Sequence, residues 1–174
     1  QDQVPKKVLS HGEFVPLKKI AEDLELEKLL SGVLPGKEVW PILTLAMNYA
    51  TRPRALTHIQ SWYEGTAISE DHPDLPLSSQ SLSRMLSRIG ESTANLEFSR
   101  KLIQQISTCS TLVYDITSLS SYSQSISLLE YGYNRDGLDL PQINLSLIVD
   151  MDLGIPVMYD LYPGSIADVS TLKN

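Results

Sequence analysis

The first hundred residues carry apolar side chains at the spacing of α-helices. In residues 17–30, leucine, isoleucine and alanine recur every three or four positions, which predicts one or two short amphipathic helices. Residues 39–49 are apolar on nearly every side, so we expect a buried helix there, with Pro41 tolerated because it lies in the first turn. This helix is predicted to form the local core.

Start and stop signals bound the remaining segments of this half. Proline suits the first position of a helix, serine caps its N-terminus and glycine ends it. On these signals we expect a helix from Pro53 to Gly65, a polar connector over residues 70–76, a helix that begins at Ser78 or Ser79 and ends at Gly90, and a last helix over residues 93–106.

Beyond Thr111 the apolar period changes from about 3.6 residues to 2. Residues 111–117 alternate between two sets of side chains and are rich in β-branched and aromatic types, which predicts a strand. Residues 143–149 and 155–161 alternate in the same way on either side of a turn, which predicts a β-hairpin. A serine-rich loop and a short strand over residues 126–133 are expected before it.

This change of period divides the chain into two regions. Residues 1–108 form the helical region, and residues 109–174 form the opening strands of an α/β domain. The expected fold class is therefore mixed α/β, with the helices first. Asp168 is expected in the first turn of a further helix, where an acid is favourable to the helix dipole, and the pattern stops within that helix.

Composition agrees with a globular protein and excludes several classes. The chain has 174 residues, 42% hydrophobic and 20% charged, and a net charge of −7. Its longest apolar stretch falls short of the roughly 20 residues that cross a bilayer, so no membrane span is expected. Nothing at its start reads as a secretory signal. Cys109 is the single cysteine, which excludes an intramolecular disulfide and a cysteine-rich zinc site, so a cytoplasmic setting is expected.

The charges are distributed unevenly. Residues 111–174 contain eight acidic and two basic side chains, whereas residues 1–60 contain seven acidic and eight basic ones. Phosphate contacts need lysine and arginine, so any nucleic-acid contact is expected mainly in the helical region. Arg84 and Arg88 stand one turn apart and project from the same side of their helix. They form either a DNA-contacting face or an ordinary solvated one.

Asp115 breaks the pattern of its strand. An acid among β-branched and aromatic residues costs desolvation energy unless it is paired or bound to a metal ion, and such violations often mark function. The alternative is that Asp115 faces solvent, or accepts hydrogen bonds from Thr117 or Ser118. Composition by itself leaves both interpretations open.

Four segments from Tyr114 onward together resemble the catalytic domain of bacterial insertion-sequence transposases of the DDE type. They are residues 114–118 (YDITS), 131–142 (YGYNRDGLDLPQ), 154–157 (GIPV) and 162–168 (YPGSIAD). The resemblance covers residues 112–174 well, and the helical region more loosely through residues 77–80 (LSSQ) and 84–90. As a set these motifs are specific, although each of them is weak by itself.

The resemblance implies a ribonuclease H-like core, here incomplete, and metal-dependent cutting and joining of transposon-end DNA. Asp115 matches the first catalytic carboxylate, on the first and central strand, and would hold Mg²⁺ in a two-ion site. The second Asp and the final Glu of the family lie in segments that these residues do not include. Arg135 matches a polar segment that can touch a DNA phosphate; alternatively it pairs with Asp136 or Asp139.

Three functions remain open from the sequence. The first is a fragment of a DNA transposase whose helical region binds DNA or self-associates, and which does not catalyse strand cleavage by itself. The second is a non-catalytic DNA-binding or regulatory remnant of such an enzyme. The third is a carboxylate hydrolase using Asp115 with Asp150 or Asp152, although those two acids are better explained as turn formers through side-chain to backbone hydrogen bonds.

The histidines and tryptophans offer no motif. The three histidines are dispersed, without the clustering of a zinc site, and are expected at the surface or at helix caps: His11, His58 and His72. Trp40 and Trp62 lie on apolar faces and are expected in the core rather than as stacking platforms for bases.

Overall fold

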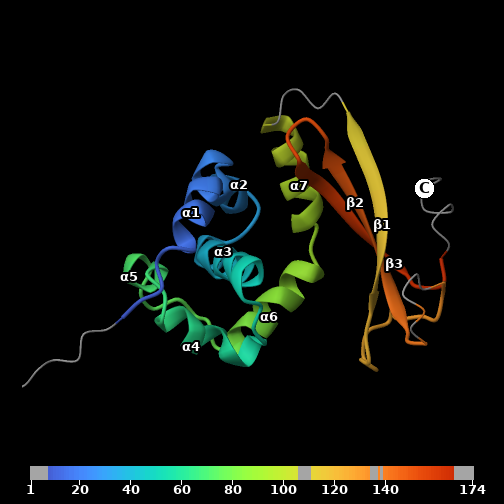
Figure 1. Ribbon diagram of the computed structural model, residues 1–174, viewed down its shortest axis with the longest axis horizontal. Helices are drawn as coiled ribbons and strands as arrows, with labels where there is room; N and C mark the ends of the chain where they lie inside the picture. The colour runs from blue at the N-terminus through green and yellow to red at the C-terminus, as the bar shows by residue number, and fades with distance from the viewer. Residues whose placement is uncertain (1–7, 106–110, 134–136, 138, 167–174) are drawn as a thin grey trace, which may run out of the picture. The chain divides into compact units, whose positions relative to one another are not determined.

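The chain folds as helices followed by strands, in the mixed α+β class that the sequence predicts. The structure is a computed structural model (Figure 1), and it describes residues 8–105, 111–133, 137 and 139–166. The chain divides into two compact units, residues 1–101 and 102–174. We call them the helical unit and the strand unit and describe each by itself.

The helical unit contains short helices around one longer one. In chain order these are α1 (Phe14–Asp23), α2 (Leu26–Ser31), α3 (Gly36–Thr51), a 3₁₀ turn (Leu56–His58), α4 (Ile59–Glu64), α5 (Ile68–Asp71), α6 (Ser79–Gly90) and α7 (Ala94–Gln105), which continues past the boundary between the units. Of the two serines expected at the start of α6, Ser78 is the cap, because its side chain accepts a hydrogen bond from the Ser81 amide.

The core of this unit draws on five helices, α1 and α3 to α6. Its fully buried members are Phe14, Met47, Ile59, Tyr63, Ile68, Leu77, Leu82 and Met85. The indole of Trp62 packs edge-on against Phe14, with ring centroids 5.8 Å apart, which confirms its predicted place at the core. Each large apolar side chain buried in this way stabilises the fold by about 1.5–3 kcal/mol.

Three helix boundaries differ from the prediction. Helix α3 begins at Gly36, so Pro41 is its sixth residue and not part of the first turn, and its missing N–H removes one bond of the helix. The expected connector over residues 70–76 begins inside α5. Pro53 starts no helix, because the helical turns resume only at Leu56.

The side chain of Asn48 explains the conformation around Pro53. Its amide nitrogen donates to the Arg52 carbonyl at 3.2 Å, and its amide oxygen accepts from the Arg54 backbone N–H at 2.9 Å. These two bonds hold the chain in a non-helical path, and a residue before proline is also disfavoured in the helical region. Tertiary hydrogen bonding thus outweighs the local preference of proline for a helix start.

The strand unit is a three-stranded antiparallel sheet in the order β1-β2-β3. The strands are β1 (Leu112–Ser120), β2 (Gln142–Asp150) and β3 (Ile155–Pro163), drawn in yellow to orange in Figure 1. The predicted hairpin is confirmed as β2 and β3. Asp150 closes its turn, since one carboxylate oxygen accepts from the backbone N–H groups of Asp152 and Leu153 at 2.9 and 3.0 Å.

The expected strand over residues 126–133 is wrong. In this segment the described residues form only one isolated bridge, between Glu130 and Gln142. Strand β2 already pairs with β1 on one side and with β3 on the other. The segment therefore meets the sheet only at its end.

Candidate functional site

Asp115 lies in the middle of β1 with its side chain exposed. It is paired across the sheet with Leu147 of β2, which is in turn opposite Tyr159 of β3. Directly opposite residues of an antiparallel sheet share a face, and side chains alternate between faces along each strand. Asp115 therefore stands on one face with apolar neighbours, among them Val113, Leu119 and Leu161, which are each at least 40% exposed.

The opposite face of the sheet buries polar side chains. Along β2 these are Gln142, Asn144, Ser146 and Asp150, which are each no more than 3% exposed, and Ile148 stands half-buried among them. The chain itself covers them: Gln142 donates to the Tyr133 carbonyl at 2.8 Å, and Asn144 donates to the Ile166 carbonyl at 2.9 Å. The sheet thus buries polar side chains on this face, while several side chains of its more apolar face are exposed.

No second carboxylate joins Asp115 in the described part of the chain. By the same alternation, Asp150 and Asp160 stand on the polar face, and Asp152 lies in the hairpin turn. Within the described ranges, no group of three or more His, Cys, Asp or Glu residues is placed to hold a metal ion. A two-ion Mg²⁺ site needs several oxygen ligands, and these residues supply one of them. Asp150 stands on the opposite face from Asp115, so the pairing of these two acids for hydrolysis is not formed.

The two candidate arginines of α6 have different surroundings. Arg88 forms an ion pair with Glu38 of α3, whose side chain is only 5% exposed. Arg84, Arg88 and Lys37 line one cavity of about 260 Å³ together with Glu38, which we call the basic cavity. Among the described residues no ion pair is formed by Arg84 or Lys37. Arg88 therefore compensates a buried carboxylate, while the other two cations remain available for a ligand.

A larger cavity of about 740 Å³ lies in the same unit, lined by residues of α1, α2 and α3 and by the end of α5. We call it the Trp40 cavity. The Trp40 ring stacks on the His72 imidazole, with centroids 3.5 Å apart and planes at 26°, and its indole N–H donates to Glu27 at 3.2 Å. Leu43 and Met47 add apolar surface.

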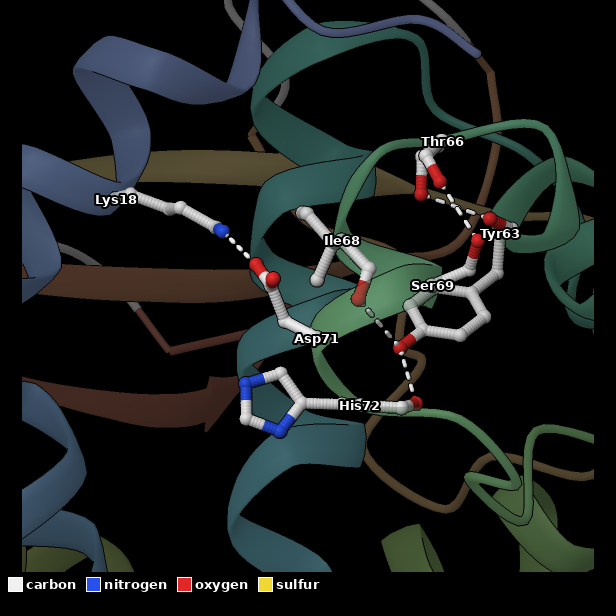
Figure 2. A network of polar contacts seen from close by, with 7 residues as sticks. All are labelled: Lys18, Tyr63, Thr66, Ile68, Ser69, Asp71 and His72. Atoms are coloured by element: carbon white, nitrogen blue, oxygen red, sulfur yellow. Dashed lines mark hydrogen bonds and ion pairs between the residues drawn. The ribbon is translucent and has the colours of Figure 1, made fainter. Parts of the chain in front are cut away.

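A network of polar contacts holds one edge of this cavity (Figure 2). The Tyr63 hydroxyl donates to the carbonyl of His72 at 2.7 Å and lies 3.2 Å from that of Ile68, and Lys18 forms an ion pair with Asp71. Burial and the nearby Asp71 carboxylate raise the pKa of Tyr63 to about 12, so the hydroxyl stays a donor at neutral pH. The chain around α5 is thereby fixed.

Electrostatics at this edge follow from the same contacts. The hydrogen bond and positive charge of Lys18 lower the pKa of Asp71, which favours its ionised form. Burial lowers the pKa of His72 below its usual 6.5, although the Asp71 and Glu27 charges oppose that shift. At neutral pH His72 is therefore an uncharged ring beside Trp40.

The other candidate residues lie apart from these sites. Arg135, with Asp136 and Asp168, falls outside the described residues. His11 and His58 are exposed, as expected. His72 is half-buried and caps the C-terminus of α5, which is one of the two positions expected for it. Trp40 packs against the core, as predicted, and its half-buried ring also forms the wall of a cavity. The spacing of Trp40, Leu43 and Met47 reads simply as a core stripe, so the sequence carries no signal for the Trp40 cavity.

Comparisons with known proteins find no relative. No protein-family model matches the chain, and neither the curated proteins nor the solved structures contain a match to it. Among the described residues, no helix has the length and apolar character that a membrane crossing requires.

Proposed function

We propose that this chain is a fragment of a DNA transposase of the DDE type, which in its intact form cuts and joins transposon-end DNA. The observation that carries the proposal is the position of Asp115, in the YDITS segment, at the centre of a strand on a mainly apolar face. A carboxylate on such a face is tolerated in water, but once the face is covered it needs a metal ion or a cation. Asp115 is thus suited to be one ligand of a metal site completed by other segments.

In this proposal the strand unit is the beginning of a ribonuclease H-like sheet. Three antiparallel strands in chain order and a tight hairpin at GIPV support it, although β1 stands at an edge of the described sheet, not at its centre. Bound Mg²⁺ would activate the attacking water or 3′-hydroxyl and stabilise the leaving oxygen. Asp115 by itself supplies one oxygen ligand, so we assign no step of strand cleavage to these residues alone.

The helical unit would supply the DNA contacts. Arg84 and Lys37 line the basic cavity without an ion pair among the described residues, and cations of this kind bind phosphate groups. The same proposal includes self-association of the intact transposase. The apolar side chains exposed around Asp115 in the described structure support it.

The test of this function begins with the coding DNA on both sides of the segment. We expect the reading frame to continue into an Asp-x-Gly strand and a downstream Glu, and the longer product to nick DNA in the presence of Mg²⁺. A longer frame without these acids would contradict the proposal. Nicking by the 174-residue chain that depends on Asp115 would contradict the view that its metal site is incomplete.

The second candidate is a non-catalytic DNA-binding or regulatory remnant, which the separate core and the basic cavity of the helical unit favour. Binding of the 174-residue chain to duplex DNA should then weaken with salt. The logarithm of the binding constant falls with the logarithm of the salt concentration, with a slope of about −0.9 per phosphate contact. Arg84→Gln and Lys37→Gln should therefore each make this slope shallower by about one. Lys19→Gln, whose lysine is already paired with Asp23, is the matched control, and Asp115→Asn should leave the slope unchanged.

A further inference from the structure

We propose that the Trp40 cavity binds a small organic cation with a planar apolar body, a function that does not rest on the transposase proposal. The cavity has about 740 Å³ of space, within the range that small-molecule sites occupy. All of its walls belong to the helical unit, so it is complete within one unit.

The aromatic wall is held in a fixed orientation. Trp40 is braced by the stacked His72 ring and by the hydrogen bond from its indole N–H to Glu27. The backbone of His72 is held in turn by the Tyr63 hydroxyl. A pre-positioned aromatic ring attracts a cation through its negative face, most strongly for tryptophan, and loses little conformational freedom when a ligand binds.

The charges around the cavity select the sign of the ligand. Its lining contains four carboxylates and two lysines: Glu22, Glu25, Glu27, Asp71, Lys18 and Lys28. Both lysines are already in ion pairs, Lys18 with Asp71 and Lys28 with Glu25 at 2.8 Å. Neither Glu22 nor Glu27 takes part in these ion pairs. The lining therefore has a net charge of −2, from two positive and four negative groups. His72 adds no positive charge at neutral pH.

The apolar surface selects the shape. Ala21, Leu43 and Met47 line the cavity beside the Trp40 ring, and such side chains pack against a flat hydrocarbon body rather than a hydrated inorganic ion. The structure thus favours a ligand with an amidinium or ammonium group near Glu22 and Glu27, and a ring against Trp40. A metal ion is not indicated, because no group of three ligating side chains is formed among the described residues.

Benzamidine is a suitable probe, with benzamide as its neutral counterpart of the same shape and benzoate as its anionic one. The titration uses the full 174-residue chain carrying Trp62→Phe, so that Trp40 is the only tryptophan. We expect saturable quenching of Trp40 fluorescence by benzamidine, with a Kd of about 1 mM or below. Benzamide should bind at least about tenfold more weakly and benzoate not measurably, because the carboxylates attract only the cation.

Variants locate the site. The double variant Glu22→Gln with Glu27→Gln should weaken benzamidine binding about tenfold and leave the weak benzamide binding unchanged. Glu97→Gln, an exposed acid on α7 outside the cavity, should change neither. Ligand-observed saturation-transfer NMR on the chain with both tryptophans repeats the measurement without fluorescence.

Equal affinities for benzamidine and benzamide would overturn the proposal, as would undiminished benzamidine binding in the Glu22/Glu27 double variant. Absence of binding in both measurements at about ten times the expected Kd would overturn it too. Circular dichroism of each variant shows that the helices are retained, and both substituted glutamates are exposed, so the fold should tolerate these changes.

Discussion

The two units differ in the side chains that they mainly bury. The helical unit closes an apolar core with contributions from five helices, α1 and α3 to α6, whereas the buried side chains of the sheet are, apart from Val157, polar, and several of its apolar side chains are exposed. Apolar burial is the main stabilising contribution to a fold. The helical unit therefore has its own source of stability, while the described strand unit depends more on backbone pairing and on the hydrogen bonds of its polar face.

The same difference separates the candidate sites. Both cavities belong to the helical unit, where the packing of helices leaves shaped spaces lined by charges of opposite net sign. Asp115 instead lies on an open, apolar sheet face without a second carboxylate from the described residues. The described residues thus form shaped cavities in one unit and a single exposed carboxylate on the sheet of the other.

The largest expected effect comes from the core of the helical unit. Leu82 is fully buried, and Leu82→Ala should lower the free energy of unfolding by about 2–5 kcal/mol through lost burial and the resulting cavity. Leu119 on the exposed face of β1 is 50% exposed, so Leu119→Ala should cost under about 0.5 kcal/mol. Urea unfolding followed by circular dichroism measures both. Similar losses would break the comparison between the units.

The ion pair between Arg88 and Glu38 is expected to have the next largest effect. Arg88→Ala removes the ion-pair partner of the buried Glu38 carboxylate, which should cost about 1–3 kcal/mol. Arg84→Ala on the same helix removes an exposed side chain without an ion pair among the described residues and should stay within about 0.5 kcal/mol. Thermal unfolding of the two variants checks the assignment, and equal stabilities would show that Arg88 is no more structural than Arg84.

Close approach of two backbone segments makes Gly164 a sensitive point of the strand unit. A Cβ at this position would lie 2.2 Å from the Gln142 carbonyl oxygen and 2.4 Å from that of Glu130. Gly164→Ala should therefore destabilise this unit by about 1–3 kcal/mol, visible as faster amide hydrogen exchange along β2. In the control Gly90→Ala, the added Cβ has no atom within 4 Å, so the change should be neutral or slightly stabilising. Unchanged hydrogen exchange in Gly164→Ala would contradict the close approach of the backbone at Gly164.

The smallest effect is a pH dependence from His72. Because burial lowers its pKa in the folded protein, the unfolded chain binds a proton first as the pH falls below 6.5. The free energy of unfolding should therefore decrease from pH 6.5 down to the folded pKa, where the loss is complete. Between pH 7.5 and 5, the urea midpoint should fall less steeply in His72→Gln than in the unsubstituted protein. His58→Gln, at an exposed position, should show the same pH dependence as the unsubstituted protein.

Local patterns predicted most of the elements. The period of apolar residues located the helices and the change to strands, the hydroxyl at Ser78 marked the cap of α6, and the turn after β2 marked the hairpin. Boundaries failed where a distant or tertiary contact decides the conformation, as with the Asn48 side chain and Pro53. The short strand over residues 126–133 failed because β2 already had a partner on both sides.

The candidate sites were less accessible to prediction. Asp115 is visible from the sequence because it violates the strand pattern, and the family resemblance supplied its proposed role. Glu38 and Arg88 are 50 positions apart, and Trp40 and His72 are 32 apart (72 − 40), so only the packing of helices brings each pair together. No periodicity encodes such pairs, and the two arginines of α6 read as equivalent until Glu38 distinguishes them.

The most direct measurement compares two aspartates on opposite faces of the sheet, in the longer product that the transposase proposal predicts. Asp115→Asn should abolish Mg²⁺-dependent DNA nicking, with a loss of at least about a thousandfold, since it removes a ligand of a two-ion site. Asp160→Asn lies on the polar face and retains an acceptor for the Leu161 backbone N–H, so it should keep most of the activity. Full activity in Asp115→Asn would contradict the central claim that this carboxylate holds the catalytic metal.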